Sequence, residues 1–376
     1  MHRLLFANRT ALVTGAGGGL GKSYALELAK RGCNVVCNDL GGTMAGKVTV
    51  SASSTGSTPV ESDGVHAVVA EIKALGGSAI ADTNNVLDAK DIVANAVNHF
   101  GSVDVIVNNA GILRDRSFHK MTEEDFQKVI DVHLLGTFRM CHEAWPLMQA
   151  QKYGRIVNVS SGAAAYGNFG QANYAAAKLG ILGLSNVLAK EGAKSNIFVN
   201  TIVPVAASRM TENLLSEELL AQMDPKHVTP IVTYLAHESN LQTGQVYEIG
   251  GGWYSTMRWQ RSQGVVLGGK VPDSGEEKVA SAEDIADNMG AISDFSLGEV
   301  AYPSSPTDAI TTFTSMLENG SFGVPEASAV PSAASTDSGD TNSAGSGGTV
   351  MTPVDSLQST ALFVALNNAV IEDSDM

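Results

Sequence analysis

Cysteine is scarce in this chain of 376 residues, which has only three, and long apolar runs are missing. Three thiols cannot form a disulfide framework, so the composition favours a reducing compartment. Cys33 and Cys37 are four residues apart on an expected strand, which separates them by about 13 Å and prevents them from sharing one metal ion. We therefore expect no metal site.

The longest uncharged stretch, Ile156 to Ala177, is rich in Asn, Ser, Gly and Gln rather than in Leu and Ile. Such a stretch does not suit the hydrocarbon core of a bilayer, so no membrane span is expected. The first ten residues, MHRLLFANRT, lack the apolar core of a secretory signal. Together these features predict a soluble, intracellular protein.

Basic residues are absent from the last 98 positions. All 24 Lys and Arg lie at or before Lys278, whereas 14 of the 39 acidic residues follow it. The first 278 residues therefore carry a formal charge near −1 and the remainder carries −14. A net charge of −15 argues against a nucleic-acid partner, because phosphate binding needs a basic face. The break in charge indicates separately organised segments, and a single domain with one acidic face is the alternative.

Short apolar runs alternate with longer helical patterns from Arg9 to about Tyr254. This alternation predicts βαβ units, in which helices cover both faces of a parallel sheet. We predict an α/β fold over residues 1–255, with a Rossmann-like, doubly wound, seven-stranded parallel sheet. The expected strands are 11–14, 34–39, 78–81, 103–108, 155–160, 197–202 and 246–249, and the expected helices lie near 20–31, 63–75, 88–100, 122–150, 171–193 and 225–237.

The pattern changes after Gly252. Residues 256–320 form an expected C-terminal extension with weak acidic helices. Of the 25 residues from Pro325 to Thr349, 20 are Gly, Ser, Thr, Ala or Pro. Such a segment cannot bury enough apolar surface to offset the entropy lost on ordering, so 321–355 is predicted to be a disordered linker. Residues 356–376 regain a helical apolar face and form an expected lone amphipathic helix.

A glycine-rich segment, TGAGGGLG at 14–21, directly follows the first expected strand and opens the first helix. Glycine permits positive φ and lets a diphosphate approach the backbone, and the helix N-terminus attracts its charge. Asp39 ends the second strand about 20 residues later, where a carboxylate accepts hydrogen bonds from ribose hydroxyls and repels a 2′-phosphate. The sequence therefore predicts a dinucleotide site that prefers NAD to NADP. By position, Asn85 and Val86 are expected near the adenine and Asn109 near the nicotinamide.

A Tyr–Lys pair follows the fifth strand. Tyr174 and Lys178 are four residues apart on an expected helix, so they share one face. A nearby ammonium stabilises the phenolate and so lowers the pKa of Tyr. The phenolate can then accept a proton nearer neutral pH. Ser161, at the end of the strand RIVNVSS, is placed to hydrogen-bond a substrate oxygen.

The order TGxxxGxG, NNAG, Ser and YxxxK over about 250 residues resembles the short-chain dehydrogenase/reductases. Stretches such as GILRDRSFHKM and YGNFGQANYAAAKLGILGL are similar to the (3R)-hydroxyacyl-CoA dehydrogenase unit of type 2 peroxisomal multifunctional enzymes, over roughly residues 4–320. The resemblance implies NAD-dependent oxidation of (3R)-3-hydroxyacyl-CoA to 3-ketoacyl-CoA in fatty-acid β-oxidation. It also implies an acyl-CoA substrate, a homodimer and a peroxisomal location.

The same resemblance implies roles for single residues. Ser161, Tyr174 and Lys178 are catalytic, and Ser161 binds substrate. His133 stands where most of the superfamily has Asn; its backbone carbonyl is implied to hold a water that links Lys178 to solvent, and a buried structural histidine is the alternative. The implied cofactor positions are Gly15, Gly19, Leu20, Asp39, Asn85, Val86, Asn109, Tyr174, Lys178, Ala206 and Ser208.

Other interpretations stay open. A 17β-hydroxysteroid dehydrogenase would use the same residues on a ring alcohol, and a non-catalytic NAD-binding scaffold would not need Ser161, Tyr174 and Lys178 at this spacing. The C-terminus DSDM is not a peroxisomal tripeptide of the SKL type, so a cytoplasmic location is the alternative. The final helix resembles the start of a sterol-carrier-like domain, which predicts that the chain is truncated. Four arginines, Arg114, Arg116, Arg258 and Arg261, suit either CoA phosphates or salt bridges.

Overall fold

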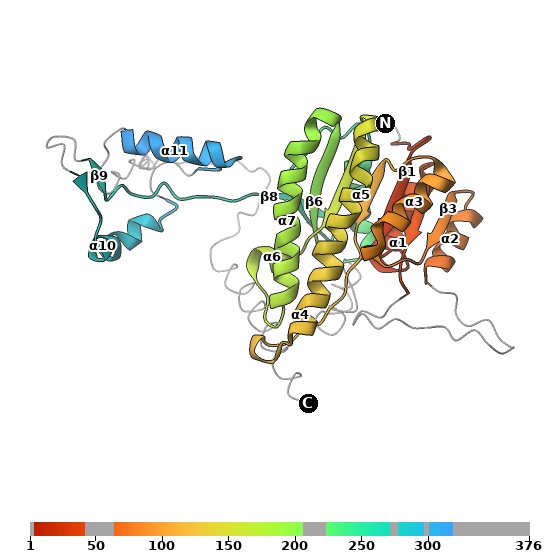
Figure 1. The fold of residues 1–376 in the computed structure, drawn as a ribbon, viewed down its shortest axis with the longest axis horizontal. Helices are drawn as coiled ribbons and strands as arrows, with labels where there is room; N and C mark the ends of the chain where they lie inside the picture. Colours follow the sequence, from red (N-terminus) through yellow and green to blue (C-terminus); the bar gives the residue numbers. More distant parts are fainter. Residues whose placement is uncertain (1–3, 42–63, 206–222, 271–276, 297–300, 319–376) are drawn as a thin grey trace, which may run out of the picture. The chain divides into compact units, whose positions relative to one another are not determined.

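The computed structural model describes residues 4–41, 64–205, 223–270, 277–296 and 301–318. The chain divides into two compact units, with the boundary between Met257 and Arg258 (Figure 1). The predicted linker 321–355 and the predicted helix 356–376 lie outside the described residues. Within the described ranges, the helices are all too short or too polar to cross a membrane.

The first unit is built on an eight-stranded sheet in the order β3-β2-β1-β4-β5-β6-β7-β8. Strands β1 to β7 pair in parallel, which confirms the predicted doubly wound sheet. Their bounds are β1 Thr10–Thr14, β2 Asn34–Asn38, β3 Ser78–Asp82, β4 Val105–Asn108, β5 Gly154–Val159, β6 Ile197–Val205 and β7 Val246–Gly250.

The eighth strand, β8 Trp253–Met257, pairs antiparallel with β7 and differs from the seven-stranded prediction. Gly251 and Gly252 join the two strands and both have positive φ, 54° and 86°. Two such residues form the type of two-residue turn that suits the twist of a hairpin. The Gly-Gly pair therefore folds the chain back along the sheet, where the sequence had suggested the end of the domain.

Helices cover both faces of the sheet, as predicted. On one face, buried side chains of α1, α2 and α9 pack on those of Ala11 and Val13 in β1, whereas on the other face α3 and α5 pack on Leu12. Figure 1 shows α5 and α7 running side by side over this second face. The longer helices are α1 Gly19–Lys30, α2 Gly64–Ala74, α3 Ala89–Phe100, α4 Glu123–Ile130, α5 Gly136–Gln151, α7 Ala172–Gly192 and α9 Thr229–Ala236.

The strand order reverses direction between β1 and β4, which are neighbours in the sheet. In open parallel sheets this reversal leaves a crevice outside the carboxyl ends of the strands, and ligands bind there. The segments that follow β1, β2, β4 and β5 all leave the sheet at this edge. The fold thus brings the predicted glycine turn, Asp39, Asn109 and Ser161 to the same end of the molecule.

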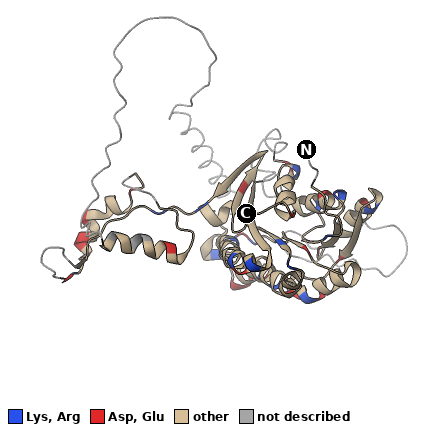
Figure 2. Cartoon of the chain, turned by 90° about the horizontal axis from the view of Figure 1, so that it is seen from above, with Lys and Arg blue, Asp and Glu red and all other residues tan. Residues whose placement is uncertain are grey.

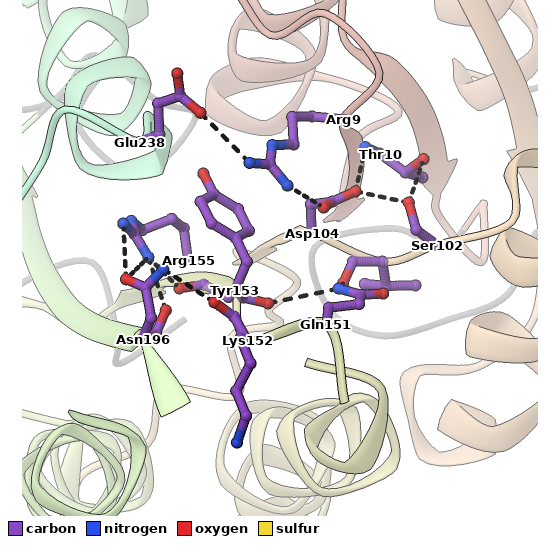
Figure 3. A network of polar contacts seen from close by, with 12 residues as sticks. Arg9, Thr10, Ser102, Asp104, Gln151, Lys152, Tyr153, Arg155, Asn196 and Glu238 are labelled. Carbon is purple, nitrogen blue, oxygen red and sulfur yellow. Dashed lines mark hydrogen bonds and ion pairs between the residues drawn. The ribbon is translucent and has the colours of Figure 1, made fainter. Parts of the chain in front are cut away.

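A polar network closes the opposite, amino-terminal edge of the sheet (Figure 3). Arg9 forms an ion pair with Asp104, with 2.9 Å between Nη1 and Oδ1. The Tyr153 ring lies between two guanidinium groups, with its centroid 3.6 Å from the Arg9 Cζ and 4.5 Å from that of Arg155. The Arg155 side chain is almost completely buried and donates to the backbone oxygen of Asn196. Ion pairs, hydrogen bonds and stacking hold this edge, which lies at the opposite end of the strands from the crevice.

The second unit contains a short antiparallel pair, β9 Gly269–Lys270 and β10 Glu277–Lys278, and two helices, α10 Ala282–Ile292 and α11 Pro306–Glu318. A capping box at Ser281 and Asp284 starts α10, which satisfies exposed amides of its first turn. Both helices carry acidic residues and lack basic ones (Figure 2). Two of the four arginines considered for CoA phosphates, Arg258 and Arg261, make contacts within this unit. The Arg258 Cζ lies 3.6 Å from the centroid of the Tyr302 ring, and Arg261 donates to the Ala309 oxygen.

Candidate active site

The glycine turn between β1 and α1 has the backbone shape that the sequence predicted. Gly15 and Gly19 have φ values of 67° and 51°, which residues with a Cβ rarely adopt. A Cβ on Gly21 would lie 2.1 Å from the Gly15 oxygen, whereas among the described residues nothing lies within 4 Å of a Cβ built on Gly18 or Gly19. The turn is tightly packed on its inner side and open at the N-terminus of α1. This open side fits a diphosphate beside unpaired helix amides, and Leu20 occupies the next position of the helix.

Two backbone amides hold the Asp39 carboxylate, and one of them belongs to this turn. Its Oδ2 accepts a hydrogen bond from the Gly17 nitrogen and its Oδ1 accepts one from the Gly41 nitrogen, both at 2.9 Å. Each carboxylate oxygen can accept a second hydrogen bond. The orientation therefore fits a ribose that carries free hydroxyls, while the negative charge disfavours a 2′-phosphate.

Asn109 connects the loop after β4 to the glycine turn. Its Nδ2 donates to the backbone oxygens of Thr14 and Gly15, at 3.1 and 3.2 Å. In return, the Thr14 Oγ1 accepts from the backbone nitrogens of Asn109 and Ala110, both at 3.0 Å. The Asn109 amide is thus engaged in shaping the turn, and a direct contact with a cofactor stays a prediction. Thr14 was not singled out from sequence, although its place directly before the glycines was a usable signal.

The adenine side of the predicted site is organised by Asp82, a buried residue that sequence reasoning missed. It accepts hydrogen bonds from the side chains of Asn38, Asn84 and Asn95, at 2.8 to 3.2 Å. Asn85 caps the short 3₁₀ turn Val86–Asp88 through the Leu87 nitrogen, and Val86 is buried. The sequence signal for Asp82 was an acidic residue at the end of an apolar strand, followed closely by Asn84 and Asn85.

Ser161, Tyr174 and Lys178 meet at the carboxyl end of β5. Ser161 begins the five-residue helix α6 Gly162–Tyr166, and its Oγ accepts from the Ala163 nitrogen at 3.2 Å. The Lys178 Nζ lies 5.5 Å from the centroid of the Tyr174 ring, as expected for one helix face. Burial raises the pKa of Tyr174, whereas a hydrogen bond from Ser161 lowers it. The phenol therefore depends on its polar neighbours to reach the phenolate state.

Lys178 is 3% exposed. Its Nζ donates to the backbone oxygen of Val159 at 2.7 Å, and its own backbone oxygen accepts from the Ser160 hydroxyl at 2.9 Å. Burial lowers the pKa of Lys178 to about 7. The residue is therefore fixed to the end of β5 and titrates near neutrality.

His133 lies in a π-helical turn, Asp131–Leu135, that continues α4 into α5. Such turns widen a helix by one residue and are frequent at functional sites. The His133 ring stands edge-on to the Tyr174 ring, with centroids 5.2 Å apart, and its Nε2 lies 2.8 Å from the Ile112 oxygen. Burial and the nearby Lys178 charge hold the pKa of His133 well below its usual value, so the ring is neutral. The side chain is buried beside the catalytic candidates, and the implied role of its backbone carbonyl stays a prediction.

The remaining site predictions have different outcomes. Ala206 and Ser208 lie outside the described residues. Arg114 forms an ion pair with Asp125 of α4, with 2.8 Å between Nη1 and Oδ1, which is the salt-bridge alternative. Within the described residues there is no group of three or more His, Cys, Asp or Glu that could hold a metal ion.

Comparisons with known proteins agree with this geometry. The sequence model of the short chain dehydrogenase family matches residues 40–219. The peroxisomal hydratase-dehydrogenase-epimerase of Saccharomyces cerevisiae is 49% identical over 265 residues, which cover 70% of this chain and 28% of the yeast protein. A Mycobacterium tuberculosis protein named as a short-chain type dehydrogenase/reductase is 43% identical over 297 residues, covering 78% of this chain and 97% of that protein.

Among solved structures, the full-length peroxisomal multifunctional enzyme type 2 from Drosophila melanogaster matches with a TM-score of 0.68 and 37% identity. The match covers 84% of this chain and 50% of the Drosophila chain. The resemblance expected from the sequence motifs is confirmed. The chain spans 28% of the yeast enzyme and half of the Drosophila chain, so it corresponds to part of these longer relatives.

Proposed function

The chain belongs to the short-chain dehydrogenase/reductase family, and we propose that it oxidises (3R)-3-hydroxyacyl-CoA to 3-ketoacyl-CoA with NAD⁺ as the oxidant. The observation that carries this proposal is the Ser161–Tyr174–Lys178 group, which lies at the same sheet edge as a glycine turn fitted to a dinucleotide. The word dehydrogenase in the name of the yeast relative supports the reaction class. The CoA ester and its stereochemistry come from the sequence resemblance to the multifunctional enzymes.

The proposed reaction uses Tyr174 as the general base. The substrate C3 hydroxyl gives its proton to the Tyr174 oxygen while the hydride leaves C3, so the carbon is oxidised to the ketone. Ser161 holds the reacting oxygen, and the Lys178 ammonium stabilises the phenolate. NAD⁺, when bound, supplies the acceptor for the hydride. Because burial raises the pKa of Tyr174, these neighbours are needed to make the phenol a base at neutral pH.

The cofactor is proposed to be NAD rather than NADP. Gly15, Gly19 and Leu20 would hold the diphosphate at the N-terminus of α1, and Asp39 would accept from the ribose hydroxyls. Other residues proposed to contact the dinucleotide are Asn85 and Val86 at the adenine, Asn109, Tyr174 and Lys178 near the nicotinamide, and Ala206 and Ser208 in the loop after β6. The proposal extends to a homodimer in the peroxisome, which the sequence resemblance and the names of the peroxisomal relatives support.

An NADH-formation assay tests the reaction. Purified protein is mixed with NAD⁺ and, in separate reactions, with a saturated (3R)-3-hydroxyacyl-CoA, its (3S) isomer and estradiol. We expect NADH with the (3R) ester and little with the other two. Faster turnover of estradiol would favour the steroid dehydrogenase alternative. A protein that binds NADH but oxidises none of the three would contradict the proposal and favour a scaffold.

A further inference from the structure

Tyr174 is preceded by a completely buried asparagine whose amide makes three hydrogen bonds. The Asn173 Nδ2 donates to the backbone oxygens of Arg114 and Asp125, at 3.0 and 3.2 Å. The Asn173 Oδ1 accepts from the backbone nitrogen of Tyr174 at 2.8 Å. One side chain thus ties the first turn of α7 to the loop after β4 and to α4.

Gln171 makes a second connection to the same loop. Its side chain is 3% exposed, and its Nε2 donates to the Asp115 Oδ2 at 2.8 Å. The backbone adds a third connection, because the Arg116 nitrogen donates to the Gly170 oxygen at 2.8 Å. Three consecutive residues of the loop, 114–116, are therefore fastened to residues 170–173, immediately before the proposed general base.

Arg114 anchors this loop at its other side through the ion pair with Asp125 in α4. Buried amides and charges are costly when their partners are lost, so such a network specifies one geometry. The network joins the loop after β4, α4 and the start of α7, and Tyr174 directly follows Asn173 in the chain. Asn173 does more than cap the start of α7. Its Oδ1 accepts from one amide of the helix, and its Nδ2 donates to the loop after β4 and to α4.

We propose that residues 114–116 position Tyr174 through Asn173 and Gln171, and that the Asp115 carboxylate tunes the phenol as a base. The proposal rests on the proposed function, in which Tyr174 accepts the substrate proton. Asn173, Gln171 and Asp115 are positioning residues, since they act on the reaction through Tyr174.

Burial, Ser161 and Asp115 shift the pKa of Tyr174, and Lys178 and His133 lie beside its ring. Ser161 lowers the pKa of the phenol by a hydrogen bond, and the Asp115 carboxylate raises it by electrostatic repulsion of the phenolate. Lys178 lies on the same helix, 5.5 Å from the ring centroid. His133 is neutral and packs on the ring edge. Asp115 is therefore the negative group in this set, and its removal should make Tyr174 a base at lower pH.

The test of the electrostatic part is Asp115→Asn, which keeps an oxygen for Gln171 and removes the charge. We expect the acid-side midpoint of kcat/KM for (3R)-3-hydroxyacyl-CoA oxidation to fall by about half a pH unit, the size of a partly screened charge interaction. The Tyr174 phenol, read directly as the ultraviolet difference between the protein and its Tyr174→Phe variant, should shift in the same direction. Asp91→Asn removes an exposed charge from α3 and should leave both midpoints unchanged.

The test of the positioning part is Asn173→Ser, which removes all three hydrogen bonds. Misplacing a reacting group by about 1 Å costs up to about 100-fold in rate, so kcat should fall by about 10- to 100-fold while the KM for NAD⁺ changes little. Asn200→Ser is the matched control. Asn200 is equally buried and bonds to the Gln242 oxygen and the Gln245 nitrogen, so its loss should lower Tm but leave kcat near that of the unchanged protein.

Failure of the inference is distinct from failure of the proposed function. An unchanged protein that does not oxidise the (3R) ester contradicts the proposed function. An active protein whose midpoints do not move in Asp115→Asn contradicts the role of Asp115, even if Asn173→Ser does not fold. Equal effects of Asn173→Ser and Asn200→Ser on kcat would show a purely structural role and overturn the positioning claim.

Discussion

The ammonium nitrogen of Lys178 is hydrogen-bonded to the backbone oxygen of Val159, 2.7 Å away, at the point where β5 ends. A side chain that reaches from a helix to the last residue of the neighbouring strand fixes the distance between the two. Because Ser161 follows β5 and Tyr174 is one turn before Lys178, this one bond sets the spacing of the candidate catalytic group. The bond also holds the Lys178 nitrogen in a buried place, where an ammonium is costly.

Lys178 should make stability depend on pH. Burial lowers its pKa in the folded protein to about 7, below the value near 10.4 of an exposed lysine. Between these values the unfolded chain binds more protons, so the free energy of unfolding should rise with pH, by about 1.4 kcal/mol per pH unit for this group. Urea unfolding of the unchanged protein and of Lys178→Met, between pH 7 and 10, measures the effect.

The other titrating groups are the same in both proteins, so their contributions to the pH dependence cancel in the difference in stability. The unchanged protein should gain stability relative to Lys178→Met as pH rises from about 7, because the cost of burying the ammonium then disappears. A stability difference that is the same at every pH would contradict a lowered pKa for Lys178.

Asp39 should decide the choice of cofactor. Replacing Asp39 by Ser removes the negative charge that is proposed to face the ribose, together with two oxygens that accept hydrogen bonds. Hydrogen bonds to a charged group contribute about 1.5–3 kcal/mol, so NADH affinity should fall by roughly tenfold or more while NADPH affinity rises. Fluorescence titration with both dinucleotides measures the change. If both affinities fell by the same factor, Asp39 would have only a structural role in the turn.

Substituting a glycine by alanine should abolish NADH binding in the glycine turn but not in α10. In Gly21→Ala the new Cβ would lie 2.1 Å from the Gly15 oxygen, so the turn must open and NADH binding should be lost. Gly290 lies in α10, where nothing described is within 4 Å of such a Cβ, and Gly290→Ala should leave NADH binding unchanged. Titration of both variants with NADH checks the contrast, and full binding by Gly21→Ala would contradict the proposed turn.

Arg155 should matter for stability and not for catalysis. Its guanidinium is buried between the rings of Tyr153 and Phe198 at the amino-terminal edge. Arg155→Ala leaves a cavity and unpaired carbonyls, which should reduce the free energy of unfolding by about 2–4 kcal/mol. Below the unfolding transition, kcat should be close to that of the unchanged protein. Urea unfolding and a steady-state assay on the same sample test both parts, and a tenfold loss of kcat would mean that the two sheet edges are coupled.

The parts of the fold that were predictable are those set by local composition. Apolar runs such as VDVIVNN marked the buried parallel strands, and TGAGGGLG marked its turn, because positive φ and close packing both require glycine there. Strand β8 was missed because its residues are mostly exposed and lack the apolar run of a buried strand. The Gly251–Gly252 pair was a hairpin signal, but the same residues also suit the end of a domain.

The site was predictable where one residue type suits one chemical role, as for Asp39 and the Tyr174–Lys178 pair. It was not predictable where a polar residue serves through a distant partner. Asn173 bonds to Arg114, 59 positions earlier in the chain, and no spacing rule connects them. The π-helical turn around His133 likewise depends on how α4 and α5 pack, which the 3.6-residue periodicity of the sequence does not record.

The most direct test of the account is Tyr174→Phe, which removes a single oxygen from the proposed general base. General base catalysis contributes about 10²- to 10⁴-fold, so oxidation of a (3R)-3-hydroxyacyl-CoA by NAD⁺ should fall by at least about 100-fold. NADH binding and Tm should stay close to those of the unchanged protein. Tyr234→Phe, which removes a hydroxyl from the partly exposed surface of α9, should keep full activity. If Tyr174→Phe kept a large part of the turnover of the (3R) ester, Tyr174 would not be the base and the central claim would be wrong.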